Sequence, residues 1–185
     1  MPNLRRIGIG ITVLAASLLV VSSVAGANVH LKGGPRAEPT FTDLGRALAA
    51  TGALSGLGNA DIEVNLEATA NVTSTCTNPA GATQPPGQNP APITVSGTQT
   101  IPTSEVKNGT VVFNVRTTEA PATIAGAPDC PNPQWTESIT DLAFTSATIT
   151  VEQPPGTTVL TISCTFGSPT SNGSVPAGNV TCTQS

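Results

Sequence analysis

The chain has 185 residues, with 7 lysines and arginines against 11 aspartates and glutamates, and a net charge of −4. It has no basic patch that could hold phosphates, which argues against nucleic-acid binding. It contains one tryptophan and no tyrosine, so it is also poorly supplied with aromatic platforms on which bases or sugars could stack.

Residues 1–27 have the features of a cleaved signal peptide. Arg5 and Arg6 are followed by a largely apolar run over residues 7–21, and residues 25–27 (Ala-Gly-Ala) fit the small-x-small pattern of a cleavage site. An uncleaved membrane anchor is the alternative, but a bilayer span needs ~20 apolar residues and this run is shorter. We therefore expect a secreted or extracellular protein, free or at the cell surface, with no membrane span after cleavage.

The remaining sequence predicts an arm followed by one domain. Residues 28–40 contain paired glycines and two prolines, which indicates a flexible, exposed N-terminal arm. Residues 41–185 have the length of a single ordinary domain. The first stretch of that domain, residues 41–57, is ambiguous, because part of it fits a helical stripe. Three glycines weaken that helix, and we expect one or two strands instead.

Residues 61–76 give the clearest pattern in the chain. Even positions carry isoleucine, valine, leucine, alanine or cysteine, broken only by Ser74, while odd positions carry aspartate, glutamate, asparagine or threonine. Side chains of a strand alternate between its two faces. This pattern therefore predicts a strand with one apolar, buried face (the dry face) and one polar, solvent-exposed face (the wet face). Sixteen residues would reach ~50 Å against the usual ~20 Å. We therefore expect this strand to bend or break near Ala68 and Ala70.

Two long segments are too rich in proline to be strands. Residues 77–92 contain five prolines and residues 119–134 contain four. Proline cannot donate to a strand ladder, so both segments are predicted to be loops. Loops of this length are commonly either functional or disordered.

The other segments alternate like strands and complete an all-β pattern. In residues 135–153 the apolar parity switches near Thr145 and Ser146, which predicts a β-bulge or a change of sheet. With turn signals between the strands and no convincing helix, we predict an antiparallel, immunoglobulin-like β-sandwich of seven or eight strands. The further strand segments are residues 93–101, 111–115 and 160–166.

All four cysteines lie beyond the predicted signal peptide: Cys76, Cys130, Cys164 and Cys182. An even number in an exported chain predicts two disulfides, and three pairings are possible. We favour Cys76–Cys130, because each of these cysteines opens a Pro-rich segment, and Cys164–Cys182, which would tie the tail to the last clear strand. No CxxC pair exists, which counts against a zinc or thioredoxin-like site.

The residues expected of an enzyme are scarce. His30 is the single histidine and lies in the predicted arm, so a Ser-His-Asp or Cys-His arrangement in the domain is not expected, and no cofactor motif is present. If cleavage follows Ala27, the chain begins Asn28-Val29-His30. The amine, two amides and imidazole could then hold Cu(II) in a square plane, although an incidental exposed histidine is the commoner case.

A row of acidic and amide side chains lies on the wet face of the clearest strand. Glu63, Asn65 and Glu67 offer the oxygen ligands that calcium prefers. A solvated strand face is the far commoner explanation of such a row. Carboxylate pairs for glycoside hydrolysis cannot be judged from spacing along the chain.

Several segments resemble a group of uncharacterised exported bacterial proteins. The likeness covers most of the chain beyond residue 27 and is carried by residues 37–43 (AEPTFTD), 56–70 (GLGNADIEVNLEATA), 76–90 (CTNPAGATQPPGQNP), 101–115 (IPTSEVKNGTVVFNV) and 130–136 (CPNPQWT). The resemblance implies a secreted single-domain protein. It implies no activity, cofactor or site residue.

The sequence favours an exported, non-enzymatic β-sandwich that acts as a surface, matrix or binding module, with a cell-envelope polysaccharide or protein as its partner. The alternatives are a small secreted hydrolase that uses carboxylates, and a protein that binds copper through its N-terminus.

Overall fold

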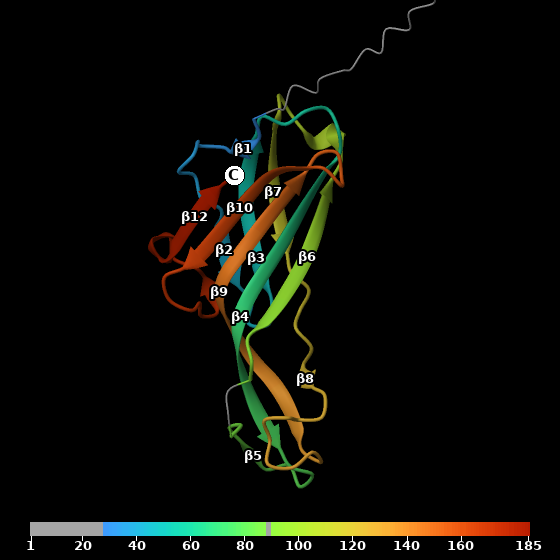
Figure 1. The fold of residues 1–185 in the computed structure, drawn as a ribbon, viewed down its shortest axis with the longest axis vertical. Helices are drawn as coiled ribbons and strands as arrows, with labels where there is room; N and C mark the ends of the chain where they lie inside the picture. Colours follow the sequence, from blue (N-terminus) through green and yellow to red (C-terminus); the bar gives the residue numbers. More distant parts are fainter. Residues whose placement is uncertain (1–27, 88–89) are drawn as a thin grey trace, which may run out of the picture.

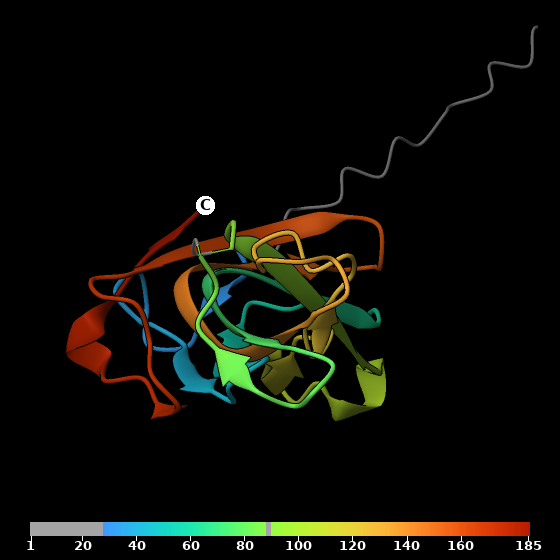
Figure 2. The same cartoon turned by 90° about the horizontal axis from the view of Figure 1, so that it is seen from below.

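The structure is a computed structural model that describes residues 28–87 and 90–185, so the predicted signal peptide lies outside the described residues. The described chain is all-β, with two antiparallel sheets that face each other as a β-sandwich (Figures 1 and 2). Two 3-10 turns, η1 (Thr103–Glu105) and η2 (Ala177–Asn179), are the helical elements of this part of the chain.

The smaller sheet has β3 (Leu48–Ser55) at its centre. One edge of β3 pairs with β7 (Thr110–Arg116), and its other edge pairs with β1 (His30–Leu31) and β2 (Thr40–Asp43). A short strand, β11 (Gly173–Ser174), pairs with β2. The strands β2 and β3 confirm the preference for strands over a helix in residues 41–57.

The larger sheet is built on β4 (Ile62–Thr77) and β9 (Thr136–Glu152), which pair along almost their whole length. Its outer strands are β5 (Thr83–Gln84), β6 (Ile93–Ile101), β8 (Thr123–Ile124), β10 (Thr158–Phe166) and β12 (Val180–Gln184). The predicted dry face of β4 is confirmed, because its even residues from Ile62 to Cys76 are buried. The core between the sheets is closed by Phe41, Phe113 and Phe144, all fully buried.

The expected break in β4 does not occur, because the irregularity lies in its partner. The ladder passes from Thr69–Ser146 to Ala70–Phe144, so Thr145 is an extra residue in β9. This confirms the bulge predicted from the parity switch. The hydroxyl of Thr145 donates to the Thr69 carbonyl at 3.2 Å and so fills the gap that the bulge leaves in the ladder.

A second bulge in β9 was not predicted. The ladder passes from Thr73–Asp141 to Ser74–Ile139, which leaves Thr140 unpaired. Its hydroxyl donates to the Thr73 carbonyl at 3.1 Å, in the same way as Thr145. Each bulge reverses the parity of β9, so the strand keeps an apolar side toward the core at both ends.

The prediction of an exposed arm for residues 28–40 is wrong at the start of this segment, although residues 32, 33, 35, 36 and 38 are exposed. Val29 and Leu31 are buried, and β1 forms an edge of the smaller sheet. The Leu31 N–H donates to Oε1 of Gln184 at 2.9 Å, across the seam between the two sheets. A glutamine side chain thus takes the place of a neighbouring strand, which the local sequence of the arm could not reveal.

Hydrogen bonds also join the two sheets along their opposite edge, between β6 and β7. The Asn114 N–H of β7 donates to Oε1 of Gln99 in β6 at 2.8 Å, and the Thr118 N–H donates to the Ser96 carbonyl at 2.8 Å. The backbones approach so closely here that a Cβ on Gly97 would lie 1.9 Å from the Arg116 carbonyl oxygen. The sandwich is therefore closed on both sides.

Candidate functional site

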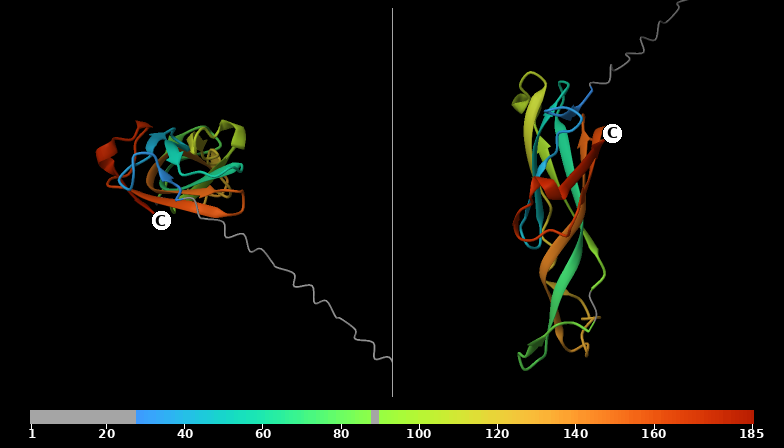
Figure 3. Two further views of the ribbon diagram at one scale, coloured as in Figure 1. Left: turned by 90° about the horizontal axis from the view of Figure 1, so that it is seen from above. Right: turned by 90° about the vertical axis from the view of Figure 1, so that its left-hand side faces the viewer.

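The β4–β9 ribbon continues beyond the sandwich and forms a narrow projection (Figures 1 and 3). β6 leaves β4 after Ala70, and β10 leaves β9 at Ser146. We call the continuation, residues 71–77 with residues 136–145, the neck ribbon. Among residues 28–87 and 90–185, the two-residue strands β5 and β8 alone extend the sheet there, so a large part of its inner face is left to be covered by loops.

The two Pro-rich loops meet on the neck ribbon. Cys130 forms a disulfide with Cys76 at the end of β4, with a Cα–Cα distance of 5.6 Å. The Gly87 N–H donates to the Asp129 carbonyl at 3.0 Å and joins the first loop to the second. The disulfide and this hydrogen bond therefore hold the two Pro-rich loops together. The other disulfide, Cys164–Cys182, joins β10 to β12, so both bonds match the favoured pairing.

Between the loops lies an apolar groove with a volume of about 790 Å³, which we call the neck groove. Val72 and Ile139 of the neck ribbon contribute to its lining. Residues 90–95 and residues 121–129 contribute the rest, and Asp129 is the one charged residue among them. The lining residues within the described part of the chain are Val72, Pro90, Ala91, Ile93, Thr94, Val95, Pro121, Thr123, Ile124, Ala125, Pro128, Asp129 and Ile139.

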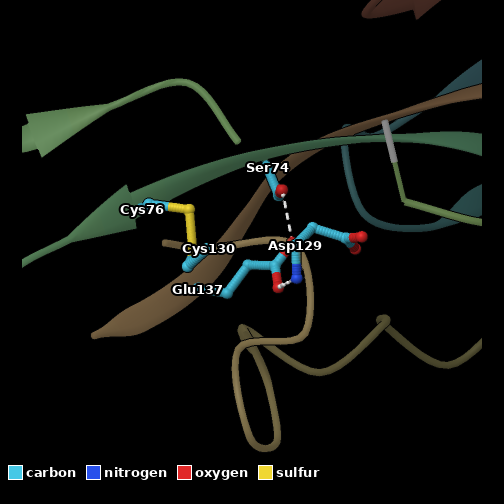
Figure 4. The surroundings of a disulfide bond; sticks show 5 residues. All are labelled: Ser74, Cys76, Asp129, Cys130 and Glu137. Carbon is cyan, nitrogen blue, oxygen red and sulfur yellow. Dashed lines mark hydrogen bonds between the residues drawn. A yellow bond between two sulfur atoms is a disulfide. The ribbon is translucent and has the colours of Figure 1, made fainter. Parts of the chain in front are cut away.

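A fully buried carboxylate lies beside the disulfide, on Glu137 of β9 (Figure 4). Its Oε1 accepts a hydrogen bond from the Ser74 hydroxyl at 2.8 Å, and its Oε2 accepts one from the Asp129 N–H at 3.3 Å. Glu137 therefore fixes the backbone of the second loop to the neck ribbon. The side chain of Asp129 points away from this contact in Figure 4. We missed Glu137 in the sequence, although it has the same parity as the inward-facing Ile139.

A second buried carboxylate, Asp43, lies in the sandwich at the end of β2. Its oxygens accept hydrogen bonds from the Thr170 hydroxyl and from the Gly45 N–H, the latter at 2.9 Å. Burial raises the pKa of Asp43, the two hydrogen bonds oppose that rise, and the nearby carboxylate of Asp141 adds to it. Neither aspartate lines the neck groove. Asp43 is only 2% exposed, so its position suits a structural role better than contact with a substrate.

The structure places the predicted metal-binding residues on two different strands, His30 on β1 and the acidic row on β4. His30 lies in β1, where its Nδ1 is 2.7 Å from the Asn28 carbonyl oxygen, an interaction that copper binding through Nδ1 would have to break. Whether Asn28 is the first residue depends on residues 1–27, which lie outside the described part. Over residues 28–87 and 90–185 no group of three or more histidine, cysteine, aspartate or glutamate side chains is placed to hold a metal ion.

The acidic row of β4 belongs to the wet outer face of the larger sheet. Asn65 donates to Glu63 at 3.1 Å and accepts from the Thr98 hydroxyl at 2.5 Å, so its polar groups are used within the sheet. Glu67 pairs in register with Thr148 and Ser96. One straight row across five strands carries hydroxyls alone: Thr181, Thr165, Ser146, Thr69 and Thr94. This face is a solvated, hydroxyl-covered surface.

In the described part of the chain, no helix has the length and apolar character needed to cross a membrane. No protein-family model, curated protein or solved structure matches this chain. The candidate site therefore rests on its own geometry.

Proposed function

We propose that this chain is an exported, non-enzymatic binding protein that holds its partner in the neck groove. The proposal includes cleavage of residues 1–27 as a signal peptide and an immunoglobulin-like arrangement of the sandwich. Two disulfides are typical of proteins that work in oxidising compartments outside the cytosol, which supports export.

One observation carries the binding function: two long Pro-rich loops are fixed on a rigid ribbon and enclose an apolar groove. Binding residues commonly lie on loops that a rigid scaffold positions. A groove of about 790 Å³ is within the usual range of ligand sites, ~300–1,000 Å³. The disulfide, the Gly87–Asp129 hydrogen bond and the buried Glu137 hold the loops before a partner arrives, which lowers the entropy cost of binding.

The direct test is retention on immobilised cell-envelope polysaccharides and on a panel of purified exported proteins. Ala125 is exposed and lines the groove, so Ala125→Trp should fill the groove without disturbing the core. Ala122 is exposed in the same loop but outside the lining, so Ala122→Trp is the matched control. We expect retention of the wild type and Ala122→Trp, and about tenfold less of Ala125→Trp. Failure of the wild type to bind any probe, or equal retention of all three, would contradict the proposal.

The two alternatives have less support. A hydrolase needs two carboxylates that face a substrate cleft, but Glu137 and Asp43 are buried, and the outer face of the larger sheet is covered mainly by hydroxyls. Copper binding through His30 needs a free amine at Asn28. It is tested by the N-terminal sequence of the secreted chain and by the absorption band of a square-planar Cu(II) complex.

A further inference from the structure

We propose that the neck groove takes an apolar polypeptide segment that carries a lysine or arginine, with the cation placed against Asp129. This inference rests on the proposed binding function and names the chemical class of the partner.

Among the described residues that line the groove, Asp129 is the one charged side chain. Residues 70–93 contain no charged side chain, and residues 120–140 contain only Asp129 and Glu137. Glu137 is fully buried and holds the Ser74 hydroxyl, so it is not available to a ligand. Asp129 lines the groove, and within the described residues its carboxylate forms no ion pair. A cation at Asp129 would therefore meet a complementary charge beside a surface of low polarity, where the attraction is screened less than in water.

The same charges and the lining disfavour other ligand classes. A fatty acid or a phosphorylated ligand would bring an anion toward Asp129, and among the described residues no cationic side chain lines the groove. None of the described lining residues is aromatic, so a sugar ring would find no side chain among them on which to stack. The apolar lining instead suits aliphatic side chains, whose burial contributes about 25 cal/mol per Å².

The backbone of the groove favours a polypeptide over a simple amine. Pro90, Pro121 and Pro128 each have a carbonyl oxygen but no N–H group, so the backbone of these three lining residues offers acceptors and no donors. A polypeptide offers a series of N–H donors to such acceptors, together with apolar side chains and one cationic side chain. One polypeptide ligand would then match the carbonyl acceptors, the apolar lining and the carboxylate of Asp129.

Selection from a phage-displayed library of random twelve-residue peptides tests the proposal on the whole exported chain. The baits are the wild type, Asp129→Lys and Glu67→Lys. Glu67 is exposed on the outer face of the larger sheet, so its reversal makes the same change in net charge away from the groove. We expect the wild type and Glu67→Lys to enrich apolar peptides with lysine or arginine. Asp129→Lys should bind those peptides about tenfold more weakly.

An enriched peptide is then synthesised with a fluorescent label and titrated against the wild type, Ala125→Trp and Ala122→Trp. Ala125→Trp should weaken its binding about tenfold, and so should replacement of the basic residue of the peptide by glutamine. No enrichment on the wild type, enrichment without an excess of basic residues, or binding unchanged in Asp129→Lys or Ala125→Trp would overturn the inference. If the wild type is still retained on polysaccharide or an exported protein through the groove, the proposed function stands and only the peptide class is wrong.

Discussion

The Thr170 hydroxyl donates a hydrogen bond to the buried carboxylate of Asp43, although the two residues lie 127 positions apart in the chain. The same Thr170 oxygen accepts the Phe144 N–H at 2.9 Å. One threonine thus joins the end of β2 in the smaller sheet to the middle of β9 in the larger sheet. The contact lies where the two sheets meet the neck ribbon.

Asp43→Asn should change how stability depends on pH. Because burial raises the pKa of Asp43 in the folded protein, the folded state binds a proton more tightly than the unfolded state does. The free energy of unfolding of the wild type should therefore fall as the pH rises from 3.8, the ordinary pKa of an aspartate, through the raised pKa of Asp43 in the folded state. Asp43→Asn should lack this loss of stability. Urea unfolding across this pH range measures the difference. Glu67→Gln, on an exposed side chain, is the control, and identical pH profiles for the wild type and Asp43→Asn would refute the assignment.

Gly97→Ala should destabilise the protein strongly. A Cβ at this position would lie 1.9 Å from the Arg116 carbonyl oxygen, so β6 and β7 would have to separate. We expect a loss of about 3 kcal/mol in the free energy of unfolding, the upper end of the usual cost of overpacking. Gly178→Ala is the control, because its added Cβ would meet nothing within 4 Å. Denaturant unfolding compares the two, and equal stability would show that the seam is not closely packed.

Gln184→Ala should loosen the first strand without unfolding the sandwich. It leaves the N–H of the buried Leu31 without its acceptor, a loss of about 1–3 kcal/mol. Hydrogen exchange should then accelerate most at the Leu31 amide. Gln184→Glu keeps the acceptor but loses the amide donor to the Gly34 and Ala37 carbonyls, so an intermediate effect is expected. Unchanged exchange at Leu31 in Gln184→Ala would argue against this role of the side chain.

The two disulfides should have separable effects. The Cys76–Cys130 bond spans 54 residues and Cys164–Cys182 spans 18, so removing each by double alanine substitution should cost about 4 and about 3 kcal/mol. Only the first removal should speed hydrogen exchange in residues 119–135 and weaken binding in the neck groove. Non-reducing peptide mapping confirms the bonds present in each variant. If loss of the Cys164–Cys182 bond weakened binding in the neck groove equally, the Cys76–Cys130 bond would have no special role in positioning the loops.

The strands could be predicted from the sequence because alternation is a local property. Residues 61–76 and the parity switch at Thr145 led to β4 and to the first bulge. The sequence also carries a signal for the second bulge, which we did not predict: the inward-facing Glu137 and Ile139 have odd numbers, whereas Leu142 and Phe144 have even numbers. A glutamate at an inward position weakens this signal, because charged side chains are usually exposed.

The arm and the groove could not be predicted, because they depend on contacts between distant residues. Leu31 is ordered by Gln184, which lies 153 positions away. The groove needs Val72 and Ile139 on adjacent strands, and a second loop held there by Cys130. The Pro-rich composition predicted where the loops lie, but only the pairing of β4 with β9 sets which apolar side chains they leave uncovered.

The position of β1 also determines how the groove is presented. The strand β1, which begins two residues after Asn28, lies toward one end of the long axis, and the neck ribbon projects from the other end (Figures 1 and 3). Anything joined to the chain through Asn28 is therefore separated from the two Pro-rich loops by the length of the sandwich. If the protein is displayed on a surface from that end, the sandwich acts as a spacer that turns the groove outward, and a tag placed there would leave the groove free for the binding experiments.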